Sequence, residues 1–109
     1  MNLRRSASTL LPLATLLALG FSSPATASSE ESWQKMFAAA KKACIEASGL
    51  AKAKASEPVV FSDDIGYVAL LVAGTYPQKH MKGQKGQMLC LFERSTGKAS
   101  TEEAAGWRW

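Results

Sequence analysis

Residues 67–76, YVALLVAGTY, and residues 88–94, MLCLFER, are the two segments that decide the fold. Both are rich in β-branched, aromatic and aliphatic residues, and Pro77 ends the first of them, so each predicts a β-strand. Neither segment alternates apolar with polar residues, as a strand with one face in water would. We therefore expect a sheet with apolar side chains on both faces.

Weaker strand patterns lie at residues 59–61 and 98–103, and the second of these is expected at an edge of the sheet. Between the first weak strand and residue 67 stands the turn-like sequence SDDIG, at residues 62–66. Asp63 and Asp64 are expected there as turn formers, because their side chains can bond to the local backbone. As neighbours on an extended chain they would point to opposite sides, which argues against an acid–base pair.

The segment before the strands predicts a helix from about Glu30 to Ser48. Ser28 and Glu31 have the spacing of a capping box, and Gly49 suits the C′ position that follows a helix. Residues 51–58, AKAKASEP, contain no large apolar residue and predict a connector. Apolar residues recur with the helical period and predict the buried face: Trp33, Met36, Phe37, Ala40, Cys44 and Ala47.

The first 27 residues have the pattern of a secretory signal peptide. An arginine pair precedes an apolar run at residues 10–21, which is shorter than the roughly 20 residues of a bilayer-spanning helix. A small-x-small cleavage pattern follows at residues 25–27. We expect residues 1–27 to be removed, and residues 28–109 to form a single small domain, without a transmembrane segment, in the periplasm or outside the cell. The two arginines leave with the signal, so the net charge falls from +4 to +2, which argues against nucleic acid as a partner.

The chain has two cysteines, Cys44 in the predicted helix and Cys90 in the middle of a predicted strand. An exported protein enters an oxidising compartment, and two cysteines allow one pairing only. Neither belongs to a C-x-x-C motif, the usual mark of a thiol-exchange catalyst. Closing a loop of about 47 residues contributes roughly 4 kcal/mol in the chain-entropy description. The expected fold class is therefore α+β, with one N-terminal helix packed on a roughly four-stranded antiparallel sheet and a helix-to-strand disulfide.

The second face of the sheet is the expected contact surface. If Cys90 faces the helix, Leu89 and Leu91 face the other way. The C-terminal Trp107 and Trp109 would either fold over this face or leave it free for a partner or a second copy of the chain. Every second residue of the predicted strand at 67–76 should lie on the same face as Leu89 and Leu91. The sequence leaves two choices open, either Tyr67, Ala69, Leu71 and Ala73 or Val68, Leu70 and Val72.

A polar loop is predicted at residues 78–87, and it holds the only histidine of the chain. One interpretation is a solvated hairpin loop, and the other is a contact for an anionic partner such as a phosphate, a lipid headgroup or a cell-wall polymer. His80 and Met81, together with Met88, form a rival hypothesis of a copper(I) site, because thioether ligands suit that ion. The candidate binding residues of the loop are Lys79, His80, Lys82 and Lys85.

The sequence offers little for catalysis, and we assign no catalytic residue, metal site or cofactor. It has no nucleophile motif such as G-x-S-x-G, and we identify no other nucleophile. A free reactive thiol at Cys44 or Cys90 would revive the hypothesis of an enzyme. We expect a non-enzymatic binding or accessory module, such as an inhibitor or a subunit of an envelope complex. Its partner would be an unknown protein or an anionic envelope component, and a homodimer is a further option. A small copper-handling protein and a small enzyme with an unrecognised site are the alternatives.

The segment from Phe61 to Arg94 contains FSDDIGY, LLVAGTYPQKHMKG and the start of MLCLFERSTG. In these motifs it resembles a type of small exported bacterial domain of unknown function. The resemblance extends over most of residues 28–109 and implies a fold of the same kind. It brings no activity, cofactor or site residue with it.

Overall fold

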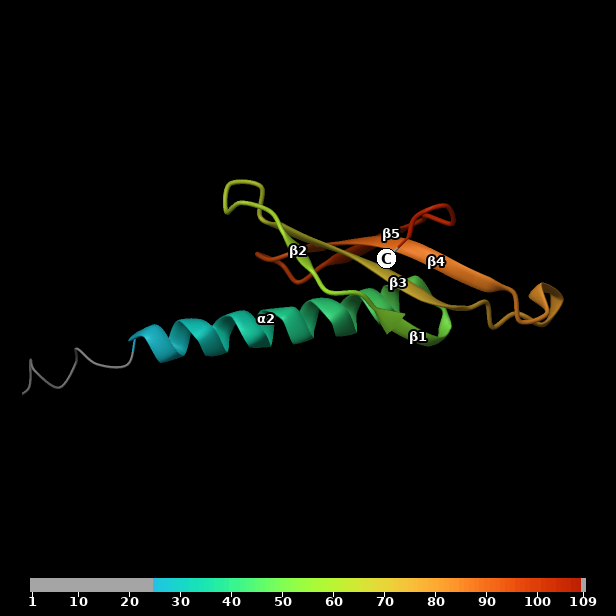
Figure 1. Cartoon of the computed structure of the whole chain (residues 1–109), viewed down its shortest axis with the longest axis horizontal. Helices are drawn as coiled ribbons and strands as arrows, with labels where there is room; N and C mark the ends of the chain where they lie inside the picture. The colour runs from blue at the N-terminus through green and yellow to red at the C-terminus, as the bar shows by residue number, and fades with distance from the viewer. Residues whose placement is uncertain (1–24, 109) are drawn as a thin grey trace, which may run out of the picture. The chain divides into compact units, whose positions relative to one another are not determined.

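The computed structural model describes residues 25–108 (Figure 1). The chain divides into two compact units between residues 32 and 33, within the helix α2 (Ala25–Ser48). The predicted signal peptide falls in residues 1–24, which lie outside the described residues, and in the first three residues of α2. Between residues 25 and 108, none of the helices combines the length and the apolar character needed to cross a membrane.

The described part of α2 extends further back than the sequence-based expectation. In the uncleaved chain it reaches Ala25, so Ser28 lies within the helix there. Two of the residues before Ser28 are alanines, and alanine has the highest helix propensity. The capping box of Ser28 and Glu31 was predicted for a chain that starts at residue 28, and it stays a prediction for that chain.

The end of α2 follows the prediction. Ser48 is the last helical residue, and Gly49 takes the left-handed conformation with φ +69°. The Ser48 hydroxyl donates to the carbonyl of Ile45 at 2.7 Å and accepts the N–H of Leu50 at 3.2 Å, so it partners backbone groups at the helix end. The expected burial is wrong for Ala47 and for Trp33: Ala47 is exposed with Ser48 buried in its place, and Trp33 is 39% exposed.

Five antiparallel strands form one sheet (Figure 1). The order is β1-β3-β4-β5, with β2 paired to the same edge of β3 as β1, so β5 lies at an edge as expected. The strands β3 and β4 pair along their whole length, from Tyr67 opposite Glu93 to Thr75 opposite Lys85. The strand bounds are β1 (Ala51–Ala55), β2 (Val59–Val60), β3 (Tyr67–Thr75), β4 (Lys85–Glu93) and β5 (Ala99–Glu103).

The predicted connector at residues 51–58 is wrong, because it contains the strand β1. Its alanines are half-buried and its lysines exposed, which is the period of two that a half-buried strand shows. Ala53 and Ala55 pack against the core, although neither is large. Small residues fit here because the backbones approach closely: a Cβ on Gly74 of β3 would lie 2.7 Å from the carbonyl oxygen of Ala51.

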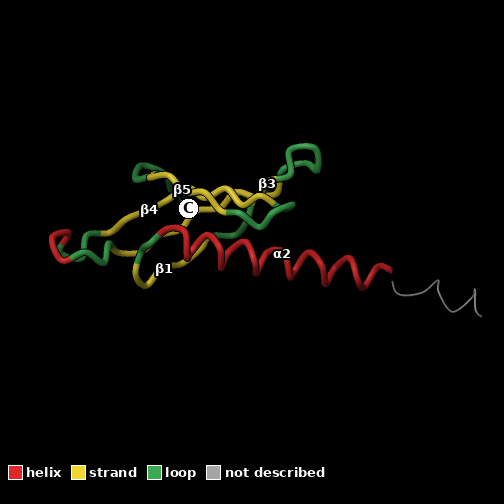
Figure 2. Tube along the Cα trace, turned by 180° about the vertical axis from the view of Figure 1, so that it is seen from behind, coloured by secondary structure: helices red, strands yellow, loops and turns green. Residues whose placement is uncertain are grey.

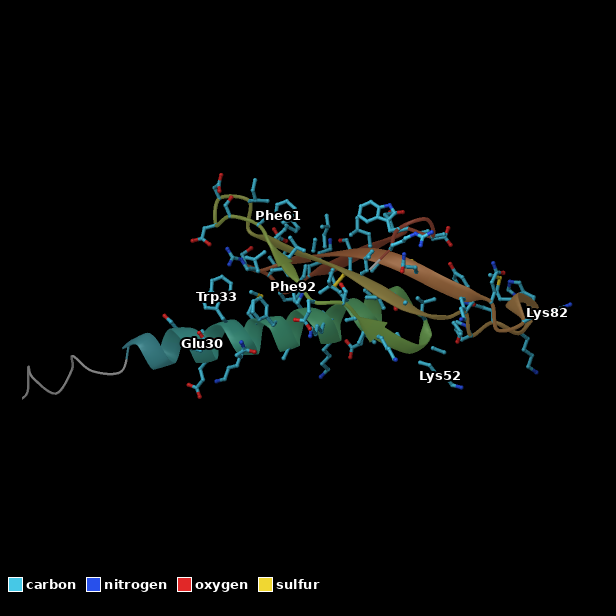
Figure 3. All side chains as sticks on the ribbon, in the orientation of Figure 1. Glu30, Trp33, Lys52, Phe61, Lys82 and Phe92 are labelled. Atoms are coloured by element: carbon cyan, nitrogen blue, oxygen red, sulfur yellow. A yellow bond between two sulfur atoms is a disulfide. The ribbon has the colours of Figure 1, made fainter. Side chains whose placement is uncertain are left out.

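The helix α2, from Trp33 onward, covers one face of the sheet, which we call the inner face (Figures 1 and 2). Leu70 of β3 pairs with Cys90 of β4, so their side chains share this face, and Phe92 lies between β4 and the helix in Figure 3. The predicted Cys44–Cys90 disulfide is present at the centre, with a Cα–Cα distance of 5.8 Å. The core cluster consists of Ala40, Cys44, Val68, Leu70, Val72, Cys90 and Phe92.

Two glycines stand opposite each other at the end of the inner face where β4 begins. Gly74 lies opposite Gly86 in the ladder, and neither residue presents a side chain. A Cβ on Gly86 would stand 2.7 Å from the ring of Tyr76 and 3.1 Å from the side chain of Leu50. The Tyr76 hydroxyl donates to the Glu103 carboxylate at 2.6 Å, so this ring also links the β3 end to β5.

Candidate functional site

An apolar groove lies on the face of the sheet opposite the core, which we call the outer face. The groove has a volume of about 570 Å³. The sequence left open which alternate set of β3 takes this face, and the structure assigns it to Tyr67, Ala69, Leu71 and Ala73. The apolar side chains that line this outer groove are Val59, Phe61, Ala69, Leu71, Leu89 and Trp107.

Strand pairing explains why these residues meet. Leu71 lies opposite Leu89, and Ala69 lies opposite both Leu91 on one side and Val59 on the other. Large apolar side chains remain open to solvent along this row, with Val59 61% and Leu91 39% exposed. Contiguous exposed apolar surface of this kind marks interaction sites in soluble proteins.

The polar residues in the wall of the outer groove are already engaged. The Ser56 hydroxyl accepts the N–H of Leu71 at 2.9 Å, and the Ser56 N–H donates to the Leu71 carbonyl at 2.8 Å. The Glu57 carboxylate forms an ion pair with Lys41 of α2 at 3.2 Å. The groove therefore presents apolar surface, because the Ser56 hydroxyl bonds to the backbone of Leu71 and the Glu57 carboxylate pairs with Lys41.

The C-terminal segment forms one wall of the groove. The Gln87 side-chain amide donates to the carbonyls of Ala104 at 2.9 Å and Trp107 at 2.6 Å, and the Ala104 N–H donates to the Gln87 carbonyl at 2.9 Å. These bonds hold the turn that places Trp107 at the rim, where it stays 57% exposed. Trp107 thus borders the outer face without covering it, and Trp109 lies outside the described residues.

The basic loop is shorter than predicted, because β4 already begins at Lys85. Its centre is the 3-10 turn η2 (Lys79–Met81), followed by Lys82 with φ +52° and Gly83 with φ +72°. Lys82 and Phe61 lie at opposite ends of the sheet in Figure 3. The candidate residues Lys79, His80, Lys82 and Lys85 are all exposed, and these lysines form no ion pair within residues 25–108.

The residues of the copper hypothesis come from different elements. His80 and Met81 belong to η2, whereas Met88 lies opposite Val72 in the β3–β4 ladder. Within the part of the chain that the structure describes, no group of three or more His, Cys, Asp or Glu side chains is placed to hold a metal ion. Cys44 and Cys90 are joined in the disulfide, so neither is a free thiol.

The acidic turn before β3 has the structural role expected from the sequence. The Ser62 carbonyl accepts two N–H groups of the turn at 2.9 Å each, and the Ser62 hydroxyl donates to the Asp64 carboxylate. This hydrogen bond lowers the pKa of Asp64 below its usual value. Asp63 forms an ion pair at 2.6 Å with Arg94, whose guanidinium also stands 5.6 Å from the centre of the Trp33 ring. Asp64 therefore serves the turn, and Asp63 links the turn to Arg94, the residue after β4.

Sequence reasoning named Leu89 and Leu91 for the outer face but missed Val59, Phe61 and Gln87. The sequence could have indicated that Val59 and Phe61 share a face, because they stand two residues apart in a strand-like segment. No local signal could reveal Gln87, since its bonds reach residues 17 and 20 positions away.

No protein-family model, no curated protein and no solved structure matches the chain.

Proposed function

We propose that this protein is an exported, non-enzymatic binding or accessory module that contacts its partner through the outer groove. The observation that carries the proposal is the exposed apolar lining of that groove, on a sheet whose other face is covered by a helix and crosslinked. Burying exposed apolar surface is the main favourable term in protein association.

The chemistry of the groove favours an apolar protein surface as the partner. Sites for small polar molecules carry a few convergent polar groups that fix the orientation of the ligand. Here Ser56 bonds to Leu71 and Glu57 pairs with Lys41, so the lining supplies no such set. Apolar centres with aromatic residues are typical of the buried core of protein interfaces, and Trp107 and Phe61 supply the aromatic residues.

Two features support export. The first 27 residues have the charged, apolar and small-residue pattern of a signal peptide. The Cys44–Cys90 disulfide is of the kind that persists in the periplasm or outside the cell and is rare in the cytosol. We place the working protein in one of these two compartments.

The basic loop would add a second, electrostatic contact with an anionic envelope component. Its lysines are exposed and form no ion pair among the described residues, so they are available to a phosphate or an acidic polymer. Such a contact would weaken with salt, because exposed charges are screened over about 8 Å at physiological ionic strength. Alanine at Lys79, Lys82 and Lys85 together should then abolish the salt-sensitive part of binding.

Site-specific photo-crosslinking in the exporting host tests the proposal. A photoreactive residue replaces Leu91, which is exposed on the outer face, and in a control replaces Ala38, which is exposed on α2. We expect a discrete covalent adduct from position 91, absent from position 38. Adding Leu89→Ser to the position 91 protein should reduce the yield while the disulfide and the urea unfolding midpoint stay close to those of the parent. Equal or absent adducts at both positions would refute the outer groove as the contact surface.

A further inference from the structure

We propose that the partner seated on the outer groove is a second copy of this chain, docked face to face with its β4 antiparallel to the first. The inference rests on the proposed function, because it names the occupant of the same groove. A two-fold axis would pass between the two sheets, perpendicular to β4 and level with Leu89.

The charge pattern of β4 points to this arrangement. Side chains two apart on a strand share a face, and Leu89 stands on the outer face midway between Lys85 and Glu93. The strand thus has a cation at one end, an anion at the other and leucines between them. The full outer-face series is Lys85, Gln87, Leu89, Leu91 and Glu93.

A two-fold axis at Leu89 pairs these charges twice. It reverses the direction of the second strand, so Lys85 of each copy lies above Glu93 of the other. Stacked sheets stand about 10 Å apart, a gap that a lysine and a glutamate side chain can bridge together. The parallel arrangement would place Lys85 above Lys85 and Glu93 above Glu93, which disfavours it.

The position of Trp107 fits the same axis. Gln87 donates to the Trp107 carbonyl, and Trp107 also lines a depression with Ala73 and Gln87, so the residue is anchored on the Lys85 side of Leu89. The two-fold axis carries this anchor point to the Glu93 side of the second copy, near Leu91 and Ala69. Leu91 is the leucine that each copy leaves exposed, so each Trp107 would cover the bare patch of the other.

The size of the face predicts a weak dimer. At about 5 Å per strand, β3 and β4 are about 30 Å long, β5 about 17 Å, and β1 with β2 about 24 Å along the other edge. Each face then presents roughly 500 Å², so two faces would bury about 1,000 Å², below the ~1,200 Å² at which standard stable interfaces begin. Glu102 adds a specific repulsion, because it lies opposite Leu89 on β5 and the axis would bring it near its own copy. Glu102→Gln should therefore tighten the dimer. This effect is not expected if the groove binds an unrelated protein.

Sedimentation equilibrium of the protein recovered unreduced from cells that express the full chain provides the test. We expect concentration-dependent dimerisation, weakened about tenfold or more by Trp107→Ala and by either Lys85→Glu or Glu93→Lys alone. The double variant Lys85→Glu/Glu93→Lys should restore the affinity to within about threefold of the parent, because the exchanged charges again face each other. Lys42→Glu, at an exposed residue of α2, is the matched control and should change nothing, because α2 lies on the other side of the sheet.

Two results would overturn the proposal. One is a protein that stays monomeric at millimolar concentration, and the other is dimerisation that the charge exchange fails to restore. The mass of the adduct from position 91 then separates the two proposals. An adduct with a different protein keeps the binding module and refutes the self-partner, whereas the absence of any adduct refutes both.

Discussion

The inner and outer faces of the sheet carry similar apolar side chains but differ in what covers them. On the inner face, Val68, Val72 and Cys90 are fully buried beneath α2. On the outer face, the neighbouring strand positions Leu91 and Val59 remain exposed. The two faces come from the same strands, so β-propensity and apolar content do not distinguish them.

The difference shows how a small domain separates stability from recognition. The inner face is held by close packing and by the covalent bond between Cys44 and Cys90. On the outer face, hydrogen bonds from Leu71 to Ser56 and from Gln87 to Trp107 fix the residues that border the groove. They leave the face itself uncovered. Substitutions on the two faces should therefore act on different properties, unfolding in one case and association in the other.

The largest effect should come from a pair of adjacent residues on opposite faces. Phe92→Ala removes a buried ring and should destabilise the fold by about 3–5 kcal/mol. Leu91→Ala, one position away and exposed, should cost less than about 1 kcal/mol. Urea unfolding at a concentration where the protein is monomeric measures both values. A loss at Leu91 equal to that at Phe92 would show that the outer face is part of the folding core.

Removing the disulfide tests how much the stability of the inner face depends on this crosslink. Cys44→Ala with Cys90→Ala should destabilise the protein by about 2–5 kcal/mol, since the bond closes a loop across 46 positions. The photo-crosslink from Leu91 should persist in whatever fraction stays folded. Unfolding midpoints with and without reductant give the comparison in the parent protein, and coincident midpoints would contradict the expected role of the bond.

A glycine substitution measures how tightly the end of the inner face is packed. Gly74→Ala places a Cβ 2.7 Å from the Ala51 carbonyl oxygen and 3.0 Å from Leu50, so the backbone of β1 must move. Overpacking of this kind costs about 1–3 kcal/mol. Gly106→Ala is the control, because its Cβ would meet nothing within 4 Å. Equal stability of the two variants would mean that β1 yields easily at this point.

The smallest effect concerns the hydroxyl of Tyr76 at the rim of the inner face. Its hydrogen bond to the Glu103 carboxylate raises the pKa of Tyr76 above the ordinary 10.0. A raised pKa in the folded state means that the contact stabilises the fold below about pH 10 and is lost as the pH rises through the folded value. Wild type should therefore exceed Tyr76→Phe in unfolding midpoint at pH 7, and this advantage should shrink as the pH rises above 10. A difference that is independent of pH would contradict this assignment.

Much of the fold was predictable because it depends on neighbours in the sequence. The helix end at Gly49, the strands around Leu70 and Cys90, and the turn at Asp63 each follow from a local pattern. The strand β1 was missed because its inward residues are alanines, which are poor strand formers, and because Lys52 adopts φ +51°, a conformation rare outside glycine. Its pairing is set by the close approach at Gly74, which no local pattern reveals.

The candidate site divides in the same way. The sequence indicated that Leu89 and Leu91 oppose Cys90, because alternation along a strand is a local rule. Spacing along the chain could also show that Val59 and Phe61 share one face of their segment, but only pairing between distant segments brings them beside these leucines and Gln87 beside Trp107.

By itself, therefore, the sequence determined the fold class, the disulfide and the presence of apolar side chains on both faces of the sheet. These follow from periodicity and from two cysteines that have only each other as partners. The tertiary structure alone decided which alternate set of β3 the helix covers and which side chains border the outer groove. That choice depends on hydrogen bonds and packing between residues far apart in the chain, such as Ser56 with Leu71 and Gln87 with Trp107.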